Sequence, residues 1–70
     1  MTTAERLRAE GEARGEVRGR AEALLDLLTL KFGAVPVKVE DVVRGADAGR
    51  LRMWAARVLA AESLDDVFTA

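Results

Sequence analysis

The stretch that decides the fold is residues 21–33, which read AEALLDLLTLKFG. Four apolar residues recur at i, i+3, i+4 and i+7, the spacing of one face of an α-helix: Ala21, Leu24, Leu25 and Leu28. Phe32 extends this face by one further turn, and Gly33 follows it as the residue type that most often ends a helix. The stretch therefore predicts the C-terminal half of a strongly amphipathic helix.

The residues before this stretch favour helix more weakly. No Pro interrupts residues 4–31, so we predict one long helix over that range. Gly11, Gly15 and Gly19 each cost roughly 1 kcal/mol relative to Ala, whereas an i, i+4 ion pair such as Glu10–Arg14 returns only about 0.3–0.5 kcal/mol. We therefore divide the chain into a charged Arg/Glu/Gly-repeat helical arm, residues 1–20, and a compact helical domain, residues 21–70. The evenly spaced glycines fit either a frayed spacer or a flat strip for a close helix contact.

Three shorter helices are predicted after Gly33. Pro36 and Gly45 bracket a helix over about 37–44, although the valines at 35, 37 and 39 also alternate as in a strand. Asp47 is an N-cap for a helix over about 48–61, and Ser63 is an N-cap for a last helix that ends near Phe68. The fold class is thus all-α, a long N-terminal helix followed by three short helices in a small helical bundle.

The predicted core collects the apolar faces of these helices, with the single tryptophan at its centre. Its members are Leu24, Leu25, Leu28, Phe32, Val39, Val42, Val43, Leu51, Trp54, Val58, Leu59, Leu64, Val67 and Phe68.

Composition excludes most kinds of chemistry. The chain has no Cys and no His, so thiolate and imidazole sites are excluded, and no disulfide can form. Eleven basic and 12 acidic side chains nearly cancel, which argues against a general nucleic-acid or membrane surface. No apolar run reaches the length of a membrane-spanning helix. We expect a cytoplasmic protein with no cofactor and no metal ion.

The remaining candidates for catalysis are two adjacent carboxylate pairs and one serine. Glu40–Asp41 and Asp65–Asp66 both lie where helices begin, and neighbouring side chains on a helix point about 100° apart, so they do not converge on a metal ion. Ser63 has no His to activate it. We therefore expect no catalytic residues and a protein that is not an enzyme.

A nucleic-acid contact is the second class of function considered. Residues 37–61 fit a helix–turn–helix, with arginines at positions 50, 52 and 57 on the second helix. However, Arg50 and Arg52 point about 160° apart at 100° per residue, and the chain has no Asn or Gln to read adenine. DNA binding by this chain alone is therefore the weaker hypothesis.

Self-association is the favoured hypothesis because the core is small and the first helix is long. Val17, Ala21, Leu24 and Leu28 form a stripe that two copies would bury in a two-fold contact. In heptad terms Leu7, Ala21 and Leu28 are a positions, and Val17 and Leu24 are d positions, whereas Glu10, Arg14 and Lys31 interrupt the seam. A homo-oligomer is expected, with a dimer as the simplest stoichiometry.

The order of these segments resembles a known family. An Arg/Glu/Gly repeat leads into LLDLLTLKFGAVP, and a tryptophan helix follows in GADAGRLRMWAARVLAAESLDDVF. This resembles the C-terminal helical domain of unknown function on Rpn-type recombination-promoting nucleases, a transposase-like branch of the PD-(D/E)XK nuclease family. The resemblance covers essentially the whole chain, and its anchors are Leu24, Leu25, Leu28, Phe32, Gly33, Pro36, Leu51, Trp54, Ser63, Leu64, Val67 and Phe68.

The resemblance implies an all-α appendage beside a nuclease domain, and it carries over no catalysis. In that family the nuclease site lies in an upstream domain, and its acidic-x-Lys strand motif does not occur in this chain. The expected partners are therefore a second copy, a nuclease domain or another protein chain. The expected function is a non-catalytic oligomerisation or protein-interaction module, with an accessory DNA-binding domain of such a nuclease as the alternative.

Overall fold

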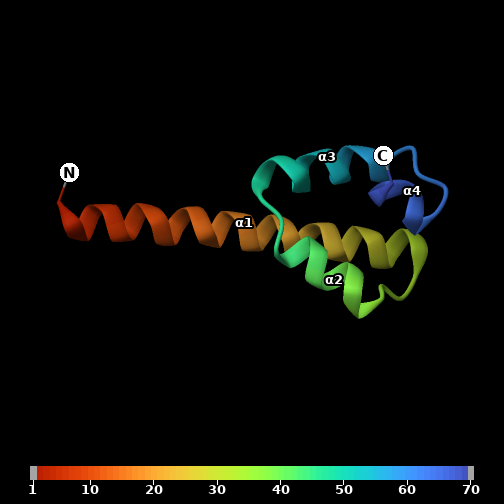
Figure 1. Ribbon diagram of the computed structural model, residues 1–70, viewed down its shortest axis with the longest axis horizontal. Coiled ribbons are helices and arrows are strands. Elements are labelled where there is room, and N and C mark those ends of the chain that lie inside the picture. Colours follow the sequence, from red (N-terminus) through yellow and green to blue (C-terminus); the bar gives the residue numbers. More distant parts are fainter. Residues whose placement is uncertain (1, 70) are drawn as a thin grey trace.

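The computed structural model describes residues 2–69 and contains four α-helices (Figure 1). They are α1 (Thr3–Phe32), α2 (Val37–Arg44), α3 (Ala48–Val58) and α4 (Leu64–Phe68), and the described residues contain no strand. The predicted all-α class, one long helix followed by three short ones, is confirmed. Of the two interpretations of residues 35–43, the helical one is correct.

The length of α1 sets the shape of the molecule. Its 30 residues run the length of a structure that measures 48 × 20 × 17 Å. In Figure 1, α2 and α3 lie on opposite sides of the C-terminal half of α1, and α4 lies beside the end of α3. The N-terminal half of α1 extends beyond the other helices as a straight rod (Figure 1), and its side chains from residue 3 to residue 16 are all exposed.

Local hydrogen bonds fix both ends of α1. The Thr2 hydroxyl accepts from the backbone N–H of Glu5 at 3.2 Å, and the Glu5 carboxylate accepts from the N–H of Thr2 at 3.3 Å. This capping box satisfies N–H groups that have no partner inside the helix. At the other end Gly33 adopts φ +85°, a conformation that strains any residue with a Cβ, and donates its N–H to the Thr29 carbonyl. Gly33 ends the helix as predicted.

The short helices begin at the caps that the sequence indicated. The Asp47 carboxylate accepts from the N–H of Arg50 at 2.8 Å. Ser63 and Asp66 form a reciprocal capping box. Pro36 is the N-cap of α2, and its side-chain ring has no atom that could accept a capping hydrogen bond.

The end of α3 differs from the prediction. The helix was expected to reach residue 61, but it ends at Val58. After Val58 the chain forms a tighter turn, in which the N–H of Leu59 donates to the Ala56 carbonyl three residues earlier. In addition, Lys31 Nζ of α1 donates to the Val58 carbonyl. Because a side chain from α1 satisfies this carbonyl, the helix can stop early and turn Ala61 into the core.

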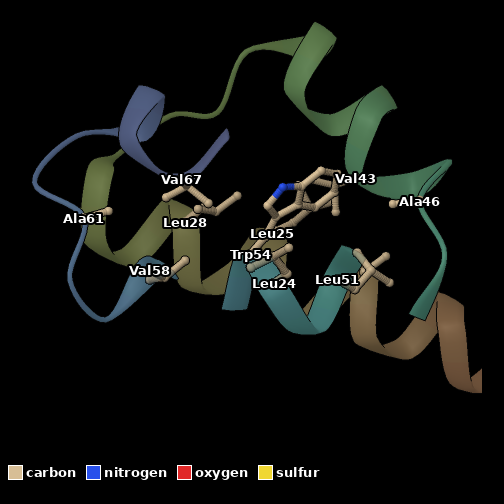
Figure 2. Packing of buried hydrophobic residues seen from close by; sticks show 11 residues of the cluster. Leu24, Leu25, Leu28, Val43, Ala46, Leu51, Trp54, Val58, Ala61 and Val67 are labelled. Atoms are coloured by element: carbon tan, nitrogen blue, oxygen red, sulfur yellow. The ribbon is translucent and has the colours of Figure 1, made fainter. Parts of the chain in front are cut away.

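The core lies between the C-terminal half of α1 and the three short helices (Figure 2). Trp54 is 6% exposed and lies near the middle of the cluster, and its ring meets Phe68 edge to face with centroids 5.0 Å apart. Of the predicted core set, Leu25, Leu51 and Val58 are also buried, and Phe32, Leu64 and Phe68 are half-buried against the cluster. The buried residues are Ala21, Leu24, Leu25, Leu28, Val43, Ala46, Leu51, Trp54, Val58, Ala61 and Val67.

Two residues of the predicted core lie at the surface instead. Val42 is 51% exposed because Val43 points into the core and Val42, one residue earlier, points about 100° away from it. Leu59 is 86% exposed because α3 ends one residue before it. The prediction that these two residues are buried is therefore wrong, whereas Ala46 and Ala61, which the predicted core did not include, are buried.

Candidate interaction surface on the arm

Three of the four residues expected to join two copies are covered by their own chain. Ala21 and Leu24 are 2% exposed and Leu28 is fully buried, because α2 and α3 pack on this face of α1. They cannot contact a second copy while the compact domain is folded, so placing a dimer contact on them is incorrect. Val17 is half-buried at the boundary where this cover ends, and it alone of the four retains surface to offer.

The same helix face continues along the arm without cover. Leu7, Glu10, Arg14 and Val17 follow at spacings of three and four residues, which is the a/d pattern of a helix seam. Leu7 is 62% exposed, and Glu10 and Arg14 are exposed as well. We call these four residues the arm seam. Its apolar ends and charged middle distinguish it from the wholly apolar face that α2 and α3 cover.

In the part of the chain that the structure describes, the charges of the arm have no ion-pair partner. Among residues 2–69, the one ion pair within 4.0 Å joins Glu22 of α1 to Arg44 of α2. The hydrogen bond that Arg44 donates to Glu22, and then the negative charge of Glu22, raise the pKa of Arg44 above its ordinary value, so this guanidinium stays charged. Glu10 and Arg14 therefore have their charges free for groups outside the chain.

A notch lies where the arm meets the compact domain. Its volume is about 460 Å³, and its walls come from one face of α1 and from the last residue of α2. Its lining residues are Ala13, Arg14, Val17, Arg18, Ala21 and Arg44. The notch thus combines an apolar floor with basic side chains at its rim. The sequence contained no signal for Arg44 at this site, because only the packing of α2 on α1 brings it there.

The glycines of the arm make no contact that would explain them. A Cβ added at Gly11, Gly15 or Gly19 would meet no atom within 4 Å outside its own helical turn. No packing within the chain therefore requires glycine at these positions. The sequence offered two interpretations of these glycines, a frayed spacer and a flat strip for another helix. Neither interpretation involves a contact with the compact domain.

Two of the other candidates for chemistry, Ser63 and Asp66, are occupied by structural hydrogen bonds. Ser63 and Asp66 cap α4 through each other, and Asp66 also accepts from the N–H of Glu62. Arg57 donates to the carbonyls of Val67 and Thr69, so it ties α3 to the end of the chain. Among residues 2–69 no three acidic side chains gather as metal ligands would, and no described helix is long and apolar enough to cross a membrane.

Comparisons with protein-family models, with curated proteins and with solved structures found no match to this chain. The resemblance to the tail domain of Rpn-type nucleases therefore rests on the order and spacing of the anchor residues alone.

Proposed function

We propose that this chain is a non-catalytic helical interaction module that self-associates through its arm, as a tail domain of the kind found on Rpn-type nucleases. One observation carries the proposal: the face of α1 that α2 and α3 bury from Ala21 onwards continues uncovered along the arm to Leu7. A second helix on this face would cover Leu7 and complete the burial of Val17.

The energetics of the arm support a partner. Three exposed glycines cost the helix roughly 3 kcal/mol relative to alanine, and helices shorter than about 12–15 residues are marginal in water even without glycine. The arm is anchored at one end by the compact domain and at the other by the Thr2–Glu5 capping box alone. Packing against another helix would supply the stabilisation that the arm's own sequence lacks.

The test is the mass of the full chain in solution, measured by light scattering at high micromolar concentration. We expect a dimer for the wild type and a monomer for Leu7→Glu, because the substitution places a charge at the apolar end of the arm seam. Leu30→Glu is the matched control: Leu30 is also a leucine of α1 and is 83% exposed, but it lies off the seam. A monomeric wild type, or a Leu7→Glu variant that stays dimeric, would contradict the proposal.

An accessory DNA-binding role is the second candidate, and one observation favours it. Arg14, Arg18 and Arg44 line the same notch, so three guanidinium groups gather at the base of the arm. Against this, Glu22 already pairs with Arg44. Fluorescence anisotropy with duplex DNA at low and moderate salt would test it, because phosphate contacts make the affinity fall steeply with salt. Loss of that binding in Arg18→Glu would support this role.

A further inference from the structure

Two copies of the arm seam match each other, layer by layer, when one copy runs in the opposite direction to the other. From the N-terminus it reads apolar, acidic, basic, apolar: Leu7, Glu10, Arg14 and Val17. In an antiparallel pair of helices, an a position of one helix lies opposite a d position of the other. One register then satisfies all four layers at once, because Leu7 meets Val17 of the second copy and Glu10 meets Arg14 of the second copy.

We infer that the occupant of the arm seam is the arm of a second copy, running antiparallel, with the two-fold axis level with Glu12. This inference rests on the proposed self-association and adds its partner, direction and register. Charge complementarity decides the direction: a parallel pair would put Glu10 against Glu10 and Arg14 against Arg14, whereas the antiparallel pair forms two opposite-charge contacts. These are charges that have no ion-pair partner among the described residues of their own chain.

The residues beside the seam allow the two arms to approach closely near the axis. Gly11 and Ala13 are the neighbours that flank the central layers, one on each side. Both are small, and the space around a Cβ at Gly11 is empty. A close approach there would shield the Glu10–Arg14 contacts from water, which strengthens charge-assisted hydrogen bonds. At the outer edges Arg6 faces Arg20 of the second copy, and that repulsion is exposed and screened by salt.

The notch fixes the register. Leu7 of the second copy lies level with Val17 of the first copy. It therefore points at the first copy's notch, which Val17, Ala21 and Arg44 help to line. A volume of about 460 Å³ leaves ample room for a leucine side chain. In this register Thr3, the first residue of the second arm's helix, lies level with Ala21, where the cover of the face begins, so the seam contact ends with the Leu7–Val17 layer. Sliding the second arm further would drive its first turn into α2, and sliding it back would withdraw Leu7 from the notch.

Single cysteines test the arrangement cleanly, because the chain has none of its own. Leu7→Cys and Val17→Cys are each oxidised alone and as an equal mixture, and cross-linked species are identified by mass. We expect a cross-linked dimer only in the mixture, and it should contain one copy of each variant. Within one variant the two cysteines would lie about 15 Å apart along the axis, at about 1.5 Å per residue over ten residues, which a disulfide cannot span.

A charge-reversal series keeps the test decisive if a cysteine variant loses its own association. Glu10→Arg should raise the dimer Kd roughly tenfold or more, because it opposes Arg14 of the second copy. The double variant Glu10→Arg with Arg14→Glu should restore the wild-type Kd. A dimer Kd that is the same for all the charge-reversal variants would overturn the antiparallel arrangement and leave self-association standing. Cross-linking of each cysteine variant with itself would have the same consequence. A monomeric wild type would overturn both.

Discussion

Trp54→Ala should unfold most of the compact domain. Trp54 is 6% exposed and contributes the largest side chain of the core, and removing a buried aromatic ring costs about 3–5 kcal/mol. The edge-to-face contact with Phe68, 5.0 Å between centroids, supplies about 0.5–1.5 kcal/mol of this cost. A domain of roughly fifty residues has a free energy of unfolding of about 2.5–7.5 kcal/mol, at about 0.05–0.15 kcal/mol per residue. The two ranges overlap, so the substitution removes most of the stability.

The assay is urea denaturation followed by far-ultraviolet circular dichroism, because the variant lacks the chain's single tryptophan as a fluorescent probe. We expect Trp54→Ala to lose most of its helical signal before urea is added, and Phe68→Leu to show an intermediate loss of stability. Met53→Ala is the matched control, since Met53 precedes Trp54 on α3 but is 43% exposed, and its effect should stay within about 0.5 kcal/mol. A Trp54→Ala variant within about 1 kcal/mol of the wild type would refute the placement of this ring at the centre of the core.

Two further predictions concern the glycines and metal ions. Gly33→Ala should lower the free energy of unfolding by roughly 1–3 kcal/mol, because residue 33 has φ +85°, whereas Gly15→Ala should stabilise the arm by up to roughly 1 kcal/mol and leave the dimer intact. Thermal melts and light scattering measure both variants, and a Gly15→Ala variant that is monomeric would move the interface to the glycine strip. Magnesium, manganese or a chelator should leave the melting temperature unchanged and duplex DNA uncut, because the described carboxylates do not gather at one place; metal-dependent cleavage would contradict a non-catalytic protein.

The limits of the helices were predictable where a single residue type determines them. Pro36 and Gly45 delimit α2 at the predicted residues 37–44, and Asp47 and Ser63 cap α3 and α4 as their side chains indicated. The end of α3 was not predicted, and the carbonyl of its last residue, Val58, accepts from Lys31, which is 27 residues away in the chain. Local sequence therefore indicates how these helices begin, whereas the contact at the end of α3 comes from tertiary packing.

The candidate site was predictable only in part, for a different physical reason. An apolar stripe such as Ala21, Leu24 and Leu28 must be covered, but periodicity does not say whether the cover is the same chain or a second copy. The structure assigns this part of the stripe to α2 and α3. What the sequence did show is the point at which the character of the face changes: the face is wholly apolar from Ala21 to Leu28, and it carries Glu10 and Arg14 before Val17.

That change of character matches the two tasks that we propose for α1. A face that packs permanently against α2 and α3 gains most from being entirely apolar, because every buried charge must be paired at a cost in desolvation. A face that meets another molecule gains from charges that reject wrong registers and directions, even though they weaken the contact. Glu10 and Arg14 lie on the uncovered half of the same helix face and in the order that one antiparallel register alone satisfies. Their placement therefore favours a reversible contact with a defined direction over an extension of the permanent core.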